Sequence, residues 1–386
     1  MQFRDLQKQY QILKPEVDRA IQQVLNAGNF ISGQQVIELE EQLAEYVGVK
    51  HCITCANGTD ALTLALMVWN IGVGDAVFVP DFTFFASGET PAYEGATPVF
   101  VDVEADTFNL SPVALEQAIL RVKEEGILTP RVIVVVDLFG QPANYLKIRE
   151  IADRYGLLIL EDGAQGFGGR LGLQKACSFG DISTTSFFPA KPLGCYGDGG
   201  AVFTNHDEWA ELLKAYKIHG KGIDKYDNIY IGVNSRLDTI QAAILKVKLK
   251  AFRKYELIDV NKVAARYAQL LCNIEAKIEL PQIAENYYSS WAQYTIQLPE
   301  NIDRNAVQEY MKMTGIPTMV YYPKPMHRQK AFEETQSAIA DCPITEKLCK
   351  RVLCLPIHPY LTEKENEVVV IALEAALKYS KENRKS

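Results

Sequence analysis

The chain has 386 residues, of which 48% are hydrophobic and 23% charged, and its formal net charge is −8. This composition is typical of a soluble globular protein, and the length suggests two or three domains. The negative charge argues against general binding to nucleic acids, because such binding needs many Lys and Arg side chains that neutralise phosphates.

Targeting and metal-binding signals are absent from the sequence pattern. No apolar stretch approaches the length of a membrane span, and the first ten residues lack the apolar segment of a secretory signal. We therefore expect a cytoplasmic protein with no membrane partner and with reduced cysteines. Cys52 and Cys55 form a C-x-x-C motif, but no second such motif or histidine pair accompanies it, so no metal site is predicted.

The predicted elements begin with two amphipathic helices, one opening at Pro15 and one following Gly33. From Cys52 to about Thr204, short apolar runs alternate with helical stretches. Apolar runs without alternation indicate strands that are buried on both faces of a parallel sheet. These runs are residues 77–79, 98–103, 132–136, 157–160 and 201–203.

The C-terminal third has a different pattern. A long helix is predicted from Thr239, alternation at 291–298 predicts a half-exposed strand, and 368–379 reads as a closing helix. Residues 381–386 are expected to fray.

We therefore predict an α/β protein with two domains. The large domain, residues 1–250, has a mostly parallel sheet between helices, and the small domain, residues 251–386, is α+β.

A phosphate site is predicted at Gly58 and Thr59, which follow a strand-like run and open a helix. Backbone N–H groups at a helix N-terminus, with a glycine that allows close approach, suit an anion. An ordinary helix N-cap would show the same residues. Neither a Walker loop nor a dinucleotide-binding loop is present, since no Gly-Lys-Ser/Thr follows and Leu171 replaces a required glycine.

Asp162 and Gln165 follow the apolar strand at 157–160. A carboxylate at the carboxyl end of a parallel strand faces the ligand crevice of an open α/β sheet, where it could keep a pyridine nitrogen protonated. Gln165 could donate a hydrogen bond to an oxygen on that ring. An Asp that caps the following turn is the alternative.

An aromatic platform and a reactive amine complete the pattern. Phe84 follows another strand end, where its ring could stack on a planar cofactor or simply join the core. Lys191 lies among small, turn-forming and hydroxyl residues at 186–200. Taken alone it could be a surface lysine, but a desolvated amine there could form a Schiff base, as pyridoxal phosphate chemistry requires.

These motifs, together with residues 3–6, 232–243 and 322–327, resemble the nucleotide-sugar aminotransferases of the DegT/DnrJ/StrS type. That family belongs to the pyridoxal phosphate enzymes of fold type I, in the aspartate aminotransferase superfamily. The resemblance spans essentially the whole chain, and its most specific parts are the motifs at 186–200 and 234–238. It implies a fold type I architecture with pyridoxal 5'-phosphate as cofactor.

The resemblance also assigns roles around the cofactor ring. Lys191 would form the Schiff base and carry the proton, so Lys191 and Asp162 are the predicted catalytic residues. Asp162 would pair with the pyridine nitrogen, Gln165 would lie near the ring oxygen, and Phe84 would stack on the ring.

By the same resemblance, Thr59, Asp60 and Ser186 would join Gly58 at the cofactor phosphate. Asn234 would reach the phosphate of a partner subunit, which implies a homodimer with shared active sites.

Two positions bear on the activity. Gly163 stands where many relatives have Ala, which loosens the local backbone. Relatives with His in place of the lysine act as dehydratases, so Lys191 favours an aminotransferase.

The residues after Lys191 look most like those of enzymes that aminate the 3-oxo derivative of UDP-N-acetylglucosaminuronic acid for surface polysaccharides. Arg236 is then a candidate partner for the sugar carboxylate, since a guanidinium pairs with it in bidentate fashion. A salt bridge between subunits or at a helix cap is the other role open to Arg236.

Tyr322 and His327 are predicted to contact the nucleotide sugar, although a lone histidine is often structural. His219 and Lys221 are further candidates.

We predict a ping-pong transamination that uses glutamate as amino donor. Amination of a dTDP-linked 3- or 4-oxo sugar is the alternative within the class. A non-catalytic, pyridoxal phosphate-binding regulatory protein is the alternative from another class.

Overall fold

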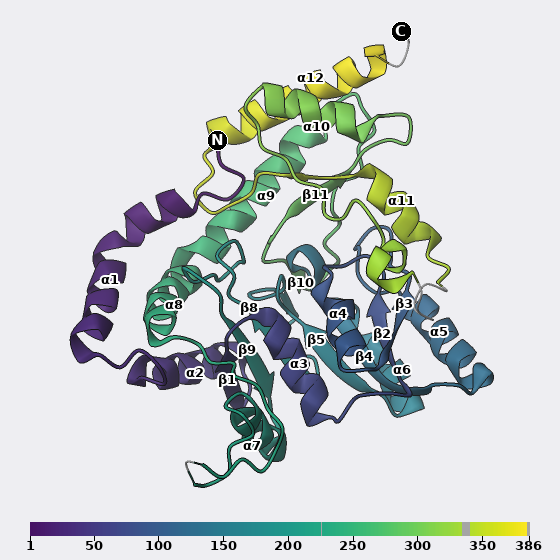
Figure 1. Ribbon diagram of the computed structural model, residues 1–386. Helices are drawn as coiled ribbons and strands as arrows, with labels where there is room; N and C mark the ends of the chain where they lie inside the picture. The colour runs from purple at the N-terminus through teal and green to yellow at the C-terminus, as the bar shows by residue number, and fades with distance from the viewer. Residues whose placement is uncertain (225, 334–339, 384–386) are drawn as a thin grey trace.

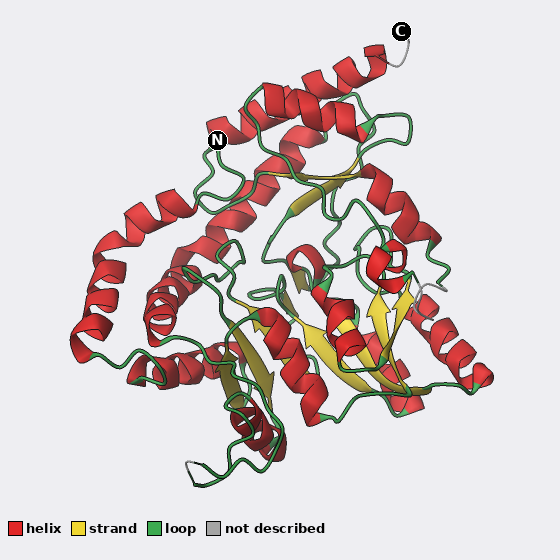
Figure 2. Cartoon of the chain, in the orientation of Figure 1, coloured by secondary structure: helices red, strands yellow, loops and turns green. Residues whose placement is uncertain are grey.

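The computed structural model describes residues 1–224, 226–333 and 340–383. A central sheet is flanked by helices, and a second group of helices surrounds a small sheet formed by the C-terminal part of the chain (Figures 1 and 2). No helix within the described residues is long and apolar enough to span a membrane.

The central sheet has seven strands in the order β1-β9-β8-β5-β4-β2-β3. Its neighbours from β8 to β3 are parallel, and β9 pairs antiparallel with both β1 and β8. The predicted mostly parallel sheet is therefore confirmed. The strands are β1 (His51–Cys55), β2 (Asp75–Pro80), β3 (Thr97–Val101), β4 (Thr129–Val136), β5 (Leu158–Asp162), β8 (Ile182–Ser186) and β9 (Gly200–Thr204).

Helices cover both faces of this sheet because its strands are apolar on both sides. One face packs against α3 (Gly58–Val68), α4 (Ala86–Tyr93) and α7 (Asp207–Tyr216). The other packs against α2 (Gln34–Val47), α5 (Pro112–Glu125), α6 (Tyr145–Tyr155) and α8 (Thr239–Ala251), and α1 (Leu6–Ala27) packs on α8.

The C-terminal part has its own apolar cluster around an antiparallel pair of strands, β11 and β12. A short π-helical turn, Phe252–Glu256, joins α8 to α9 without a break, so the predicted boundary at residue 250 stays a prediction. The elements here are α9 (Leu257–Leu271), β11 (Tyr294–Gln297), α10 (Arg304–Met313), α11 (Pro343–Arg351), β12 (Val352–Leu355) and α12 (Glu363–Asn383).

A third, small sheet joins the two parts of the chain, because β10 pairs with β6. Its strands are β6 (Arg170–Leu171), β7 (Gln174–Lys175) and β10 (Tyr287–Tyr288). Single-turn helices occur at Leu138–Gly140, Met326–Arg328 and Lys330–Phe332.

Three local predictions need correction or completion. The first helix begins at Leu6 rather than Pro15, because the Asp5 carboxylate accepts the Lys8 N–H at 2.8 Å and caps the helix. Of the tail expected to fray, α12 extends through Asn383, and 384–386 lie outside the described residues. The strand predicted as half-exposed at 291–298 is β11, and all four of its residues are buried. All eight cysteines are free thiols.

Candidate functional site

The predicted site motifs follow the carboxyl ends of parallel strands. Gly58 comes after β1, Phe84 after β2, Gln165 after β5 and Lys191 after β8. Because the carboxyl ends of parallel strands share one edge of a sheet, the fold gathers these residues at one edge.

Lys191 is held in a closed loop between β8 and β9. The register pairs Ser186 with Gly200, so residues 187–199 leave and re-enter the sheet at the same point. Within the loop, the Lys191 N–H donates to the Phe188 carbonyl at 2.8 Å, and Gly194 is required because a Cβ there would lie 2.5 Å from the Pro189 oxygen.

The Lys191 amine is not that of an ordinary surface lysine. Burial lowers its pKa, and the nearby Arg4 charge lowers it further, while the Asp162 carboxylate opposes both effects. The effect of burial on the pKa is therefore larger than that of the attraction to Asp162, and a larger fraction of the amine is neutral.

Asp162 is the last residue of β5, and its side chain is buried. The Ser87 hydroxyl on α4 donates to one carboxylate oxygen at 2.8 Å, and the Ala164 N–H donates to the other at 3.2 Å. These bonds fix the orientation of the carboxylate. The sequence did not single out Ser87, although it lies in the same segment as Phe84.

Gln165 is oriented by two hydrogen bonds. Its Oε1 accepts the Phe139 N–H at 2.9 Å, and its Nε2 donates to the Tyr322 hydroxyl at 3.1 Å. Burial raises the pKa of Tyr322, so this phenol stays protonated. Tyr322, predicted as a substrate contact, therefore adjoins the predicted cofactor ligands.

The predicted phosphate site lies at the N-terminus of α3. Asn57 caps the helix by accepting the Asp60 N–H at 2.8 Å, and Gly58 and Thr59 form its first turn. A Cβ on Gly58 would come within 2.7 Å of the Ser186 Cβ. The glycine therefore lets Ser186 approach, which adds a hydroxyl to a helix end that already favours anions.

Phe84 and Asn234 both have exposed side chains, and 55% of the Phe84 surface is accessible. The segment that carries Asn234 is tied to the same edge of the sheet, because the Ser235 hydroxyl accepts the Ala56 N–H at 3.0 Å. Phe84 thus presents an apolar ring that a bound aromatic ring could cover.

Together these residues fit pyridoxal phosphate. The desolvated Lys191 amine lies near the buried, hydrogen-bonded carboxylate of Asp162. At the same edge of the sheet, the N-terminus of α3 and the Ser186 hydroxyl form an anion site. The individual roles of these residues toward the cofactor stay predictions.

Gly163 is explained by its neighbours. A Cβ at this position would lie 2.6 Å from the Cys177 Sγ and 3.0 Å from the Thr184 oxygen. Cys177 therefore occupies the space that an alanine side chain would need, and the backbone after Asp162 is packed rather than loose.

Arg236, His219 and Lys221 line a hollow of about 850 Å³ together with apolar side chains such as Ile229 and Ile231. Among the described residues, Arg236 forms no ion pair with a carboxylate, so its guanidinium is available to a ligand or to another chain.

His327 is buried, and the protein already occupies both of its ring nitrogens. Its Nδ1 lies 2.7 Å from the Asp81 carboxylate, and its Nε2 lies 3.5 Å from Glu346. The Cys342 Sγ is also close. One atom able to bind a metal ion from each of Asp81, His327 and Cys342 lies within 4.8 Å of the other two. His327 links the end of β2 to the C-terminal part, and its predicted contact with substrate stays a prediction.

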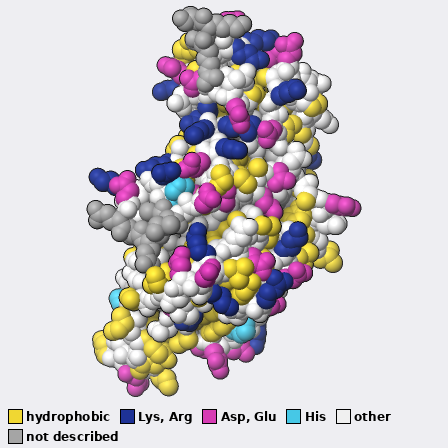
Figure 3. Space-filling model, turned by 90° about the vertical axis from the view of Figure 1, so that its right-hand side faces the viewer, with side chains coloured by type: hydrophobic (Ala, Val, Ile, Leu, Met, Phe, Trp, Pro, Cys, Tyr) yellow, Lys and Arg dark blue, Asp and Glu magenta, His cyan; other side chains and the backbone are white. Residues whose placement is uncertain are grey.

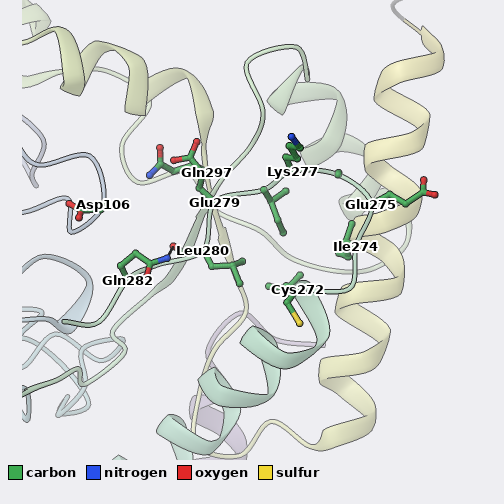
Figure 4. Close-up of a pocket in the computed structure, with 12 residues that line it drawn as sticks. Asp106, Cys272, Ile274, Glu275, Lys277, Glu279, Leu280, Gln282 and Gln297 are labelled. Carbon is green, nitrogen blue, oxygen red and sulfur yellow. Dashed lines mark hydrogen bonds between the residues drawn. The ribbon is translucent and has the colours of Figure 1, made fainter. Parts of the chain in front are cut away.

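A separate cavity of about 560 Å³ lies in the segment after α9 (Figure 4). Its walls include Cys272, Lys277, Glu279 and Gln297, and none of the predicted site residues lines it.

The chain matches the family model described as the DegT/DnrJ/EryC1/StrS aminotransferase family over residues 11–374. It is 43% identical to a UDP-2-acetamido-2-deoxy-3-oxo-D-glucuronate aminotransferase from Pseudomonas aeruginosa, covering 97% of this chain and 99% of that protein.

Two solved structures are similar over most of the chain. A DegT/DnrJ/EryC1/StrS aminotransferase from Brucella abortus has a TM-score of 0.94 at 44% identity, covering 98% of this chain and 99% of its own. NtdA from Bacillus subtilis, with bound cofactor PMP, has a TM-score of 0.84 at 29% identity, covering 95% and 82%. The predicted fold type I architecture is confirmed.

The His327–Asp81 pair should make stability depend on pH. The Asp81 carboxylate raises the pKa of His327. The pair therefore stabilises the folded protein fully below about pH 6.5, and this stabilisation is lost as the pH rises through the raised pKa. We expect the unfolding free energy difference between wild type and His327→Gln, measured with urea, to be larger at about pH 6 than at about pH 9.

The exposed His206, which forms no ion pair among the described residues, provides the matched control His206→Gln. A difference for His327→Gln that stays constant with pH would contradict the pairing.

Proposed function

The chain belongs to the DegT/DnrJ/EryC1/StrS aminotransferase family, and on that premise we propose that it moves an amino group from glutamate to UDP-linked 3-oxo-N-acetylglucosaminuronate. It is a pyridoxal phosphate-dependent nucleotide-sugar aminotransferase. The observation that carries the proposal is the desolvated Lys191 amine near the buried, hydrogen-bonded carboxylate of Asp162.

When bound, pyridoxal phosphate supplies an aldehyde for the amine and a ring that accepts the electron pair released at the substrate carbon. Asp162 would hold a proton on the ring nitrogen, with its carboxylate oriented by the Ser87 hydroxyl and the Ala164 N–H. Gln165, whose Nε2 already donates one hydrogen bond to Tyr322, would offer its second Nε2 N–H to the ring oxygen.

Lys191 carries the proton. Its Nζ, neutral for a larger fraction of time because its pKa is lowered, accepts the proton released from the α-carbon of the donor. In the second half of the cycle, Nζ returns a proton at the carbon that receives the amine. The closed loop at 187–199 keeps this Nζ within reach of the reacting carbon in both halves of the catalytic cycle.

The preference for a UDP-linked uronate is supported by the Pseudomonas aeruginosa relative and by Arg236. A guanidinium without an ion pair in the described chain, on the wall of a large hollow, suits a carboxylate. We further propose a role in surface polysaccharide synthesis in the cytoplasm, as the resemblance of the residues after Lys191 implies.

We also propose a homodimer. The loop after α7 exposes large apolar side chains, with Ile223 100%, Ile229 56% and Ile231 92% accessible, beside the exposed Asn234. Hydrophobic side chains gather at the lower end of the face in Figure 3, the end at which Figure 1 places α7 and the following loop. Such a surface is typical of an interface between chains.

Lys191→Ala should abolish the visible absorbance of lysine-bound cofactor and lower transamination by at least about 100-fold, since both the covalent anchor and the proton carrier are lost. Absorbance spectra with and without glutamate test this, with Lys250→Ala as a control at a lysine whose side chain is 71% accessible. A Lys191→Ala spectrum equal to that of wild type would refute the assignment.

Arg236→Gln should reduce kcat/KM for the UDP-linked 3-oxo uronate about 10- to 100-fold, through KM, because a charge-assisted hydrogen bond is lost. The neutral UDP-linked 3-oxo sugar, which lacks the carboxylate, should be affected little. Equal losses of kcat/KM on both substrates would show that Arg236 does not bind the carboxylate.

Light scattering should give a mass of twice the 43.2 kDa chain. Ile231→Glu should shift the protein toward monomer and reduce activity, because a buried charge opposes association. Leu173→Glu is the control, since Leu173 is 95% accessible but lies on the β6–β7 turn. A monomeric, active wild type would rule out shared active sites.

A further inference from the structure

The segment before α1 reaches the wall of the active site. The Phe3 ring meets the edge of the Tyr321 ring, with centroids 6.4 Å apart, next to the residue that binds Gln165. Asp5 caps α1 and Lys8 donates to the Tyr360 carbonyl at 2.9 Å, so both ends of the segment are fixed.

Arg4 lies between these anchors and contacts the Lys191 loop directly. Its Nη2 donates to the Lys191 carbonyl at 3.0 Å and, at 3.5 Å, to the Pro192 carbonyl. One guanidinium nitrogen therefore restrains two consecutive peptide units of the loop that presents the amine.

A buried carboxylate, Glu256, lies near enough to the guanidinium to favour its charge. Glu256 is 2% accessible and accepts a hydrogen bond from Gln9 Nε2 at 2.7 Å and another from the Tyr360 hydroxyl. Glu256 is the main charge that favours the guanidinium, whereas burial lowers the pKa of Arg4 to about 10. Arg4 thus keeps its charge at neutral pH.

Other charged groups surround the loop from neighbouring elements. Lys248 on α8 is 1% accessible, its ammonium lies 5.0 Å from the centroid of the Tyr196 ring, and burial lowers its pKa to about 8. The remaining titratable groups near Arg4 and Lys191 are Asp5, Asp162, Glu256, His358 and Tyr360.

We propose that Arg4 is a positioning residue for Lys191, fixing the backbone of the loop and keeping a positive charge beside the amine. This inference rests on the proposed function, in which Lys191 is the reacting amine. Arg4 is not among the residues predicted to bind the cofactor ring. It affects the reaction only by positioning Lys191.

The charge and the hydrogen bonds of Arg4 have separate consequences. The charge disfavours a second positive charge on Lys191, which contributes to its lowered pKa. The hydrogen bonds limit the orientations of the Lys191 backbone, which keeps Nζ near the end of β5.

The test measures amine reactivity in the full-length protein freed of cofactor, so it does not depend on turnover. Pulses of an acylating reagent across a pH series, followed by peptide mass spectrometry, report the fraction of neutral Lys191. Arg4→Gln keeps a donor but removes the charge, Arg4→Lys keeps the charge but not the planar fork, and Arg19→Gln changes an exposed arginine on α1.

Arg4→Gln should slow labelling of Lys191 about tenfold at a fixed pH below the midpoint, which corresponds to a midpoint about one pH unit higher. Arg4→Lys should restore most of the rate, and Arg19→Gln should leave it unchanged. Equal profiles for Arg4→Gln and wild type, with melting curves that show both folded, would overturn the proposal.

The labelling result separates this inference from the proposed function. If Lys191→Ala loses the cofactor absorbance but Arg4→Gln labels like wild type, the function stands and the role of Arg4 is wrong. If Lys191→Ala keeps the absorbance, the proposed function fails, whatever the labelling of the Arg4 variants shows. Should Arg4→Gln fail to fold, the Arg4→Lys profile decides: a profile like that of wild type supports the charge effect, and a tenfold loss contradicts it.

Discussion

The antiparallel pairing of β9 between β1 and β8 is the constraint on which the rest of the site depends. It returns the chain at Gly200 opposite Ser186, so the loop that carries Lys191 is closed at its base. The same pairing places that loop over the carboxyl edge of the parallel strands, beside the end of β5. Without this pairing, the lysine would lie on an open connection, and neither its burial nor its approach to Asp162 would be defined.

Within that frame, the lysine and the carboxylate are held in different ways. The Asp162 carboxylate is held in one orientation by hydrogen bonds from the Ser87 hydroxyl and the Ala164 N–H. Lys191 has less water and a positive neighbour, Arg4, and these two effects exceed the attraction of Asp162. An amine with a lowered pKa, held beside a carboxylate of fixed orientation, suits proton transfer at a carbon atom.

The sequence could predict residues whose role depends on their place at a strand end. Asp162 and Gly58 directly follow strand-like runs, and Lys191 lies among small and turn-forming residues before the apolar run at 201–203, so the sheet brings these residues together. It could not predict partners that meet only through the fold, such as Ser87 with Asp162 or Arg4 with Lys191, which are 75 and 187 residues apart. Strand β8 was also missed, because its Ser and Thr side chains bond to Glu161 and Gly163 instead of forming an apolar pattern.

The most direct measurement of the central claim is borohydride reduction of the cofactor-loaded protein, followed by peptide mass spectrometry. Reduction makes a carbon–nitrogen double bond between a lysine and the cofactor permanent. We expect the added mass of the reduced cofactor on the peptide that contains Lys191, and on no other lysine at comparable yield. Modification of a different lysine, or of none, would contradict the assignment of Lys191 as the reacting amine.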